Sequence, residues 1–193
     1  MSLKIVVFYG SVREDRQGIK AARFVVNKLE ERGHEVNLAD PMDYKLPLLN
    51  KRFRFMEEGE APDKLKELAG MIEEADAFVV VSAEYNHSMP PALTNMMDYF
   101  LEEYFFRPSL IVTYSGGIFG GVRAGVQLRS FLGELGTATV PSMLPIPKVQ
   151  SAFDEEGNPT DEKFNKFIKQ PLDELEWYAK VMKDGRKNYE RPY

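Results

Sequence analysis

The sequence has no cysteine among its 193 residues. Disulfide bonds, zinc–thiolate centres, iron–sulfur clusters and thiol nucleophiles are therefore excluded. No apolar run approaches the roughly 18 residues that a membrane-spanning helix needs. The short apolar run at residues 3–9 is followed by a Gly-Ser-x-Arg loop, not by a signal-cleavage site. We expect a cytoplasmic protein that has no membrane partner.

Positive charge is also scarce, because 25 Lys and Arg residues face 30 Asp and Glu residues, which gives a formal net charge of −5. This balance argues against broad binding to nucleic acid, and it disfavours anionic ligands unless a local feature reverses the sign. With 44% hydrophobic and 28% charged residues, the composition is typical of a globular protein. The length suits one domain over residues 1–193, with residues 147–193 as a C-terminal helical extension.

Apolar runs alternate with apolar residues at helical spacing along the chain. The runs predict strands, and the helical spacing predicts a helix after each of them, with Pro171 breaking or restarting the last one. Such alternation predicts an α/β fold with a parallel sheet covered on both faces. Five strands favour a flavodoxin-like three-layer sandwich in the strand order 2-1-3-4-5. The expected strands are 3–9, 34–39, 78–81, 110–114 and 139–144, and the expected helices are 19–29, 65–72, 93–101, 124–135 and 164–182.

Ligands of such sheets bind beyond the carboxyl ends of the strands, so three loops are candidates for a site. The first loop, residues 10–18, joins a strand to a helix and contains Ser11, Arg13, Arg16 and Gln17. These side chains and the backbone amides of a helix N-terminus could bind a phosphate. The alternative is a polar turn with solvated arginines. Gly-x-Gly-x-x-Gly and Walker A patterns are both missing, which disfavours classical dinucleotide and P-loop sites.

The second loop, residues 83–91, contains Tyr85, Asn86 and His87 between a buried strand and a helix that starts at a proline. Tyr85 offers a stacking face, and Asn86 offers hydrogen bonds to a heteroaromatic ring. The alternative is that Tyr85 packs locally and Pro90 only starts the helix. His87 and Ser88 do not suit a hydrolase, because adjacent side chains point apart and the Gly-x-Ser-x-Gly elbow is missing. The only other histidine, His34, lies in a predicted edge strand, so we expect no metal site.

The third loop, residues 115–121, has four glycines in its last six residues. Glycines let the backbone approach a flat ligand closely. Taken alone, a glycine-rich loop is weak support for a ligand site, but its place after the fourth strand strengthens the interpretation.

Together the three loops carry a family resemblance. The motifs Gly10-Ser11-Val12-Arg13, Glu84-Tyr85-Asn86-His87-Ser88-Met89-Pro90 with Leu93 and Asp98, and Ser115-Gly116-Gly117 with Gly120-Gly121 resemble the NADPH-dependent FMN reductase family over roughly the first 145 residues. The resemblance implies a flavodoxin-like fold, FMN as cofactor, and NADPH or NADH as reductant. It also implies a quinone, an azo compound, a free flavin or a similar small-molecule acceptor, and assembly as a homodimer or homotetramer.

The resemblance also implies roles for particular residues, while no catalytic side chain is expected because the flavin carries the chemistry. The FMN phosphate would be held by Ser11, Arg13, Arg16, Gln17 and Gly18, the isoalloxazine by Glu84, Tyr85, Asn86 and His87, and its pyrimidine side by Ser115, Gly116 and Gly117. Three positions depart from the family pattern: Ala83 replaces a proline, Pro91 a glycine and Thr94 a lysine. In some relatives that lysine and the acidic residue matched by Asp98 are associated with subunit contacts, so this contact is in doubt here.

Two interpretations compete with a reductase: an electron carrier of flavodoxin type, and a cofactor-free interaction module. Carriers usually have a hydroxyl-rich phosphate loop, so Arg13 and Arg16 favour the reductase. The long segment 41–62 interleaves basic and aromatic residues, but its glutamates cancel the charge, so we expect a lid or a subunit contact more than a plain packed loop. The methionine and aromatic residues at 96–106 are expected to serve the core and a subunit interface.

Overall fold

Five strands form one parallel sheet in the order β2-β1-β3-β4-β5. The structure is a computed structural model, and it describes residues 1–192. In the sheet, Ile5 lies opposite Val36 on one side and opposite Ala77 on the other. The flavodoxin-like order expected from the sequence is therefore confirmed. The strands are β1 (Lys4–Tyr9), β2 (Glu35–Ala39), β3 (Ala77–Ala83), β4 (Pro108–Tyr114) and β5 (Ala138–Ile146).

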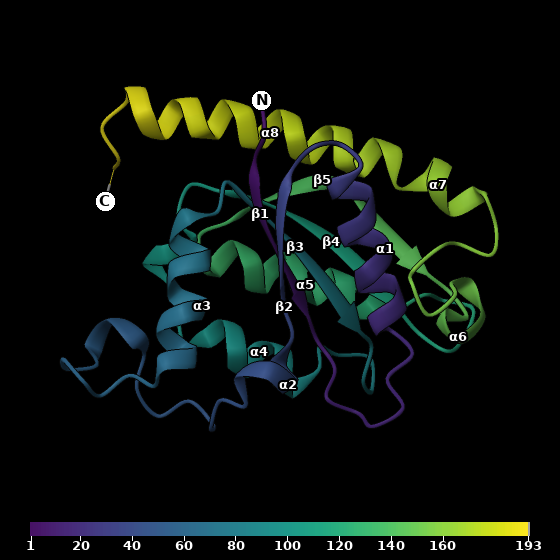
Figure 1. The fold of residues 1–193 in the computed structure, drawn as a ribbon, viewed down its shortest axis with the longest axis horizontal. Coiled ribbons are helices and arrows are strands. Elements are labelled where there is room, and N and C mark those ends of the chain that lie inside the picture. The colour runs from purple at the N-terminus through teal and green to yellow at the C-terminus, as the bar shows by residue number, and fades with distance from the viewer. Residues whose placement is uncertain (193) are drawn as a thin grey trace.

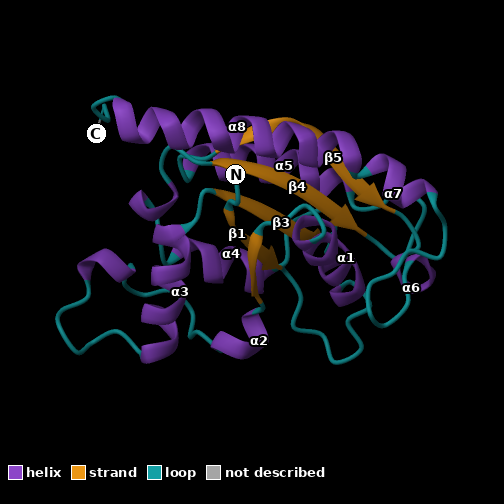
Figure 2. Cartoon of the chain, turned by 45° about the horizontal axis from the view of Figure 1, so that its top comes forward, coloured by secondary structure: helices purple, strands orange, loops and turns teal. Residues whose placement is uncertain are grey.

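The central strands β3 and β4 are buried throughout and mostly apolar because helices cover both faces of the sheet. In β1, Ile5 and Val7 pack on one face, while Val6 and Phe8 pack on the other. α1 (Ile19–Glu30) and α8 (Lys169–Asn188) supply the first layer, and α3 (Asp63–Glu74), α4 (Pro91–Asp98) and α5 (Val122–Glu134) supply the second (Figures 1 and 2). Two short helices, α6 (Val149–Ala152) and α7 (Lys163–Phe167), lead from β5 into α8.

Two helices differ in detail from the ranges that the apolar spacing predicts. α4 ends at Asp98, so the expectation that the helix reaches Leu101 is wrong. The backbone amide of Phe53 donates to the carbonyl oxygen of Tyr99 at 2.9 Å, which draws the chain away from a helical path. The last helix does restart, with a break at Ile168 and Pro171 in the first turn of α8. A proline is tolerated there because the first amides of a helix have no intrahelical partner.

The segment 41–62 carries structure of its own and is anchored on α4. It contains α2 (Pro41–Tyr44) and the 3₁₀ turn η1 (Phe53–Phe55). The Asn95 side chain accepts from the amide of Leu49 at 2.9 Å and donates to the carbonyl oxygen of Pro47 at 2.8 Å. Two of its four basic residues are paired, Lys51 with Glu60 and Arg54 with Glu102. The segment therefore packs as an ordered part of the domain.

The aromatic and methionine residues at 96–106 serve mainly the core. Met96, Met97, Phe100 and Tyr104 are all buried against the inner face of α3 and the sheet. Their contribution to a subunit interface stays a prediction.

The amino ends of the strands and the end of α8 lie at the same end of the sheet (Figure 1). There Asp76 accepts from the Lys183 ammonium at 2.7 Å and from Arg186 at 3.3 Å, and Arg186 also donates to the carbonyl oxygen of Phe106. These contacts attach the C-terminal helix to the starts of β3 and β4. Among residues 1–192, no helix combines the length and apolarity required to cross a membrane.

Candidate active site

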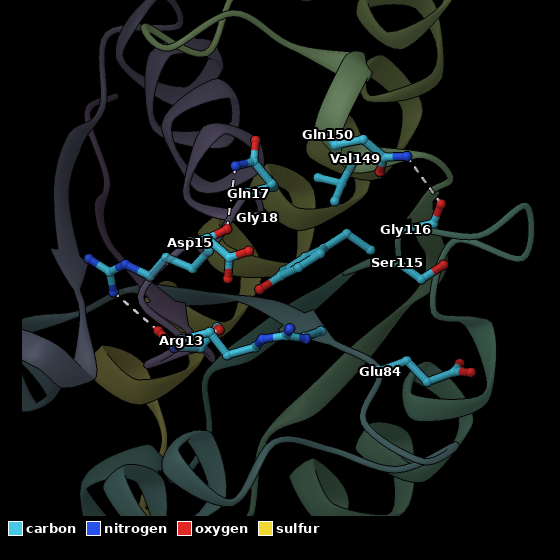
Figure 3. A pocket seen from close by; sticks show the side chains of 13 residues that line it. Arg13, Asp15, Gln17, Gly18, Glu84, Ser115, Gly116, Val149 and Gln150 are labelled. Carbon is cyan, nitrogen blue, oxygen red and sulfur yellow. Dashed lines mark hydrogen bonds between the residues drawn. The ribbon is translucent and has the colours of Figure 1, made fainter.

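A polar cavity of about 200 Å³ lies at the carboxyl ends of β1, β3 and β4. All three loops and the start of α6 contribute to its wall. Figure 3 shows Asp15 and Gln17 beside α1, with Ser115, Gly116 and Gln150 across the cavity from them. The lining residues are Ser11, Arg13, Asp15, Arg16, Gln17, Gly18, Ala83, Glu84, Tyr114, Ser115, Gly116, Val149 and Gln150.

The sequence analysis placed many of these residues at the site but missed some and included others that lie outside the wall. Tyr85, Asn86, His87 and Gly117 were expected there and are not among the lining residues. Asp15, Ala83, Tyr114, Val149 and Gln150 line the cavity without having been expected. Tyr114 could have been found, because it is the last residue of an expected strand. No local signal marks Gln150, which lies beyond the third loop.

The start of α1 and Arg13 make the cavity suitable for an anion. No side chain caps α1, and no acidic residue lies in its first turn. Its first amides make only long contacts, 3.5 Å from Ile19 to Arg16 and 3.4 Å from Lys20 to Gln17. Within residues 1–192 the guanidinium of Arg13 makes neither a hydrogen bond nor an ion pair. Weakly bonded amide donors and an unpaired cation at a helix N-terminus suit a phosphate group.

Arg16 lines the same cavity, but its guanidinium is already committed. Its Nη1 donates to Asp40 Oδ1 at 2.5 Å and to the carbonyl oxygen of Ser11 at 3.1 Å. The guanidinium also lies 5.2 Å from the centre of the Tyr9 ring. Burial acts to lower the pKa of Arg16, but the hydrogen bond and charge of Asp40 outweigh it and raise the pKa. Of the two arginines in the cavity wall, Arg13 is therefore the unpaired one, while Arg16 holds the backbone of the first loop in place.

Gly18 is required by the ring that lies above it. A Cβ atom at this position would be 1.9 Å from Cζ of Tyr114. The Tyr114 ring stacks on Tyr9 with centroids 6.2 Å apart, and its hydroxyl donates to the Tyr9 hydroxyl at 3.2 Å. Burial raises the pKa of Tyr114 well above its ordinary value, so this phenol stays neutral. The cavity wall thus contains a neutral Tyr114 ring that is packed on Tyr9 behind it.

The second loop contacts the first loop through its tyrosine. The hydroxyls of Tyr85 and Ser11 are 2.7 Å apart and form a hydrogen bond. Beyond Tyr85 the chain makes a tight turn whose tip, Asn86 and His87, is not among the residues that line the cavity. The Ser88 hydroxyl donates to Oε1 of Gln127 at 2.7 Å, so it is engaged by an amide. This geometry offers no activated serine.

Glu84 connects the second loop to α5. Its carboxylate accepts from the backbone amides of Arg123 at 3.0 Å and Ala124 at 3.4 Å, which caps the start of that helix. A carboxylate at a helix N-terminus is favoured by the helix dipole. The Glu84 carboxylate is therefore held by protein donors, although the residue also lines the cavity.

The third loop is closed by the chain that follows β5. The amides of Lys148 and Val149 donate to the carbonyl oxygens of Gly117 and Ser115, at 3.0 and 3.1 Å. These two bonds bring α6 to the cavity, where Gln150 Nε2 donates to Gly116 O at 3.4 Å. The C-terminal segment thus completes a wall that the three loops leave open.

The residues present fit FMN. The uncapped amides of α1, the unpaired Arg13 and the Ser11 hydroxyl suit its phosphate, and the glycine-rich third loop suits the approach of a flat ring. The fit extends to Gly18, because any larger residue would fill the space that Tyr114 occupies.

Comparison with known proteins agrees with the geometry. A quinone reductase of Escherichia coli (strain K12) is 34% identical over 134 residues, which is 67% of this chain and 69% of the relative. An NAD(P)H-dependent FMN reductase of Pseudomonas aeruginosa is 28% identical over 187 residues, 94% of this chain and 97% of the relative. The structure of a flavoenzyme NAD(P)H:acceptor oxidoreductase from Paracoccus denitrificans superimposes with a TM-score of 0.72 at 25% identity, covering 94% of this chain and 98% of that one. The family model for NADPH-dependent FMN reductase matches residues 3–151. This chain belongs to the NADPH-dependent FMN reductase family.

Proposed function

We propose that this chain is an oxidoreductase that uses NADPH or NADH to reduce quinones, azo compounds, free flavins or similar small acceptors, with FMN as cofactor. The observation that supports it most strongly is the cavity at the start of α1, with weakly bonded amides and an unpaired Arg13. When bound, FMN supplies the redox chemistry by exchanging hydride with a nicotinamide and electrons with the acceptor. The protein then has to bind FMN, orient its ring and tune its reactivity.

Each loop has its own role in this proposal. In the first loop, Ser11, Arg13, Gln17 and the amide of Gly18 bind the phosphate, and Arg16 fixes the backbone of Ser11. The second loop, Glu84 to His87, borders the isoalloxazine ring. Ser115, Gly116 and Gly117 present backbone donors toward its pyrimidine side, where they stabilise negative charge on the reduced ring. No side chain has to act as a general acid or base.

Titration and turnover together test the function. The fluorescence of FMN should be quenched when FMN is added to the purified chain. The FMN-loaded chain should oxidise NADPH or NADH when a quinone or free FMN is supplied. Binding without turnover would identify an electron carrier of flavodoxin type. Neither binding nor turnover would identify a cofactor-free interaction module. The N-terminus of α1, which suits an anion, and the unpaired Arg13 argue against a cofactor-free module.

We also propose that the whole chain works as one domain, with residues 147–193 as an extension that completes the site. Val149 and Gln150 line the cavity, and Leu172 and Leu175 of α8 pack in the core beneath it. A chain ending at Ile146 should therefore lose both FMN binding and cooperative unfolding, measured by fluorescence titration and thermal denaturation.

Assembly as a homodimer or homotetramer in the cytoplasm completes the proposal. Exposed apolar side chains at Ile118, Phe119 and Val126 form a surface beside the third loop that a second copy could cover. A chain without cysteine suits a reducing compartment. Light scattering of the purified protein would give its mass, and a monomer at every concentration would contradict the assembly.

A further inference from the structure

The tip of the second loop has two non-glycine residues at positive φ, a conformation that is uncommon for residues with a side chain. Tyr85 and Ser88 exchange two backbone hydrogen bonds of 2.9 Å each, which closes a two-residue turn. Asn86 and His87 between them have φ angles of 51° and 64°. Such a turn prefers glycine in its second position, because a side chain is strained at positive φ. A turn with His87 there needs support from its surroundings.

One side chain outside the loop supplies that support. Gln127, on α5, donates from Nε2 to the carbonyl oxygen of His87 at 3.0 Å. Its Oε1 accepts from the Ser88 hydroxyl at 2.7 Å. A single amide group therefore uses both its donor and its acceptor on the same turn. The His87 carbonyl can only accept, so it fixes which end of the amide faces it.

α5 also holds the other end of the same loop. Glu84 caps its first turn through the amides of Arg123 and Ala124. The third loop runs directly into α5 at Gly121 and Val122. One rigid helix therefore carries the third loop at its N-terminus, the start of the second loop at its first turn, and the tip of the second loop at Gln127.

We propose that Gln127 is a positioning residue for the cofactor: it holds the Asn86–His87 turn at a fixed distance from the third loop, so that both loops present their backbone donors to the FMN ring. The inference depends on the FMN reductase function proposed above. Gln127 does not line the cavity and acts only through the turn. Its effect on the cofactor therefore differs from that of a cavity residue such as Arg13.

Two substitutions of similar size separate the contacts. Gln127→Met removes donor and acceptor alike, whereas Gln127→Glu keeps an acceptor for Ser88 and sets a carboxylate against the His87 carbonyl oxygen. Loss of one or two such hydrogen bonds should weaken FMN binding about three- to tenfold at neutral pH, with Gln127→Glu at least as weak as Gln127→Met. Ser130→Glu is the matched control, because Ser130 is exposed one turn further along α5 and makes no contact with the turn. It should bind FMN like the wild type.

A pH series measures an effect that a purely structural role of Gln127 would not produce. Below its pKa, near 4.3 in the ordinary case, the introduced glutamic acid regains an O–H donor for the His87 carbonyl. The series is measured in a His87→Asn background, which removes the imidazole from the turn, while Asn tolerates positive φ. Arg123 and Glu84 also face this part of α5 and are common to the proteins compared. Taken relative to Gln127 in the same background, FMN affinity of the Glu variant should recover as the pH falls through about 4.3.

The outcomes distinguish this inference from the function on which it depends. A wild-type chain that binds no FMN would refute the proposed function. If the wild type binds FMN and both Gln127 variants bind it equally well, the positioning role is refuted while the function stands. A Glu variant whose deficit does not change with pH would also overturn the role, since the hydrogen-bond donor would then be irrelevant. Thermal denaturation without FMN completes the test, because equal melting temperatures exclude a general loss of fold.

Discussion

Replacement of Gly18 by alanine tests the packing that shapes the cavity. Gly18 has φ −68° and ψ −13°, a conformation that any residue adopts, so the backbone itself does not require glycine here. The added Cβ would lie 1.9 Å from Cζ of Tyr114, whereas ordinary contact begins at 3.4 Å, so the two groups must separate by about 1.5 Å. Tyr114 cannot withdraw easily, because it is 6% exposed and stacks on Tyr9.

Overpacking of this kind costs about 1–3 kcal/mol, which lowers the melting temperature of a chain of this length by about 2–12 °C. Calorimetry of the FMN-free protein measures the change, and fluorescence titration should show weaker FMN binding because the Tyr114 ring is displaced toward the cavity. Gly70→Ala is the control, since nothing lies within 4 Å of its Cβ position in α3. That variant should gain about 0.5–1 kcal/mol from helix propensity.

A double-mutant cycle identifies Tyr114 as the cause. Tyr114→Leu removes Cζ, Cε2 and the hydroxyl oxygen, the three atoms closest to the added Cβ. In that background Gly18→Ala should cost nothing, and a coupling energy of about 1–3 kcal/mol should appear. If Gly18→Ala is as stable as the wild type, or costs the same with and without the Tyr114 ring, the steric reasoning is refuted.

Three further predictions concern charge. Arg13→Ala should weaken FMN binding at least tenfold, the loss of a charge-assisted hydrogen bond, without changing the melting temperature of the FMN-free protein; unchanged affinity in fluorescence titration would remove Arg13 from the phosphate site. Burial raises the pKa of Tyr44 to about 12, so its contribution to stability is fully present below pH 10 and disappears as the pH rises through 12; a near-ultraviolet titration should show one late-ionising phenol fewer in Tyr44→Phe. Burial acts to raise the pKa of Glu176, but the hydrogen bonds and charges of Arg32 and His34 together outweigh it and lower the pKa below 4.5. Its stabilising effect is therefore present above pH 4.5 and lost as the pH falls through the lowered value, so in urea unfolding the deficit of Glu176→Gln should shrink in acid, and a constant deficit would contradict the assignment.

Much of the fold could be predicted because the strongest signals are local. β1 and β3 read as unbroken apolar runs since both faces of each strand are buried. Ser11, Arg13 and Gly18 could be assigned to the site from the rule that ligands bind beyond the carboxyl ends of parallel strands. The end of α4 could not, because the apolar spacing continues to Leu101 and the chain departs from it only through a contact with Phe53.

The unpredicted parts of the site depend on residues that are distant in sequence. The sequence alone predicts that Arg16 binds the phosphate. In the structure its guanidinium instead donates to Asp40, 24 residues away. Gln150 reaches the cavity only because the chain after β5 turns back onto the third loop through Lys148, which has φ 48°. The apolar spacing of α5 predicts only that Gln127 is exposed. Each contact depends on tertiary packing that no local pattern encodes.

The position of the C-terminal helix has a practical consequence. α8 runs back from the cavity side and ends beside the starts of β3 and β4, where the chain also begins (Figure 1). A tag, a fused partner or a tether to an electrode joined at either end would therefore leave the domain on the side away from the three loops. Such a conjugate should keep its cofactor cavity open to dissolved acceptors, which makes the chain a convenient component for an immobilised redox catalyst.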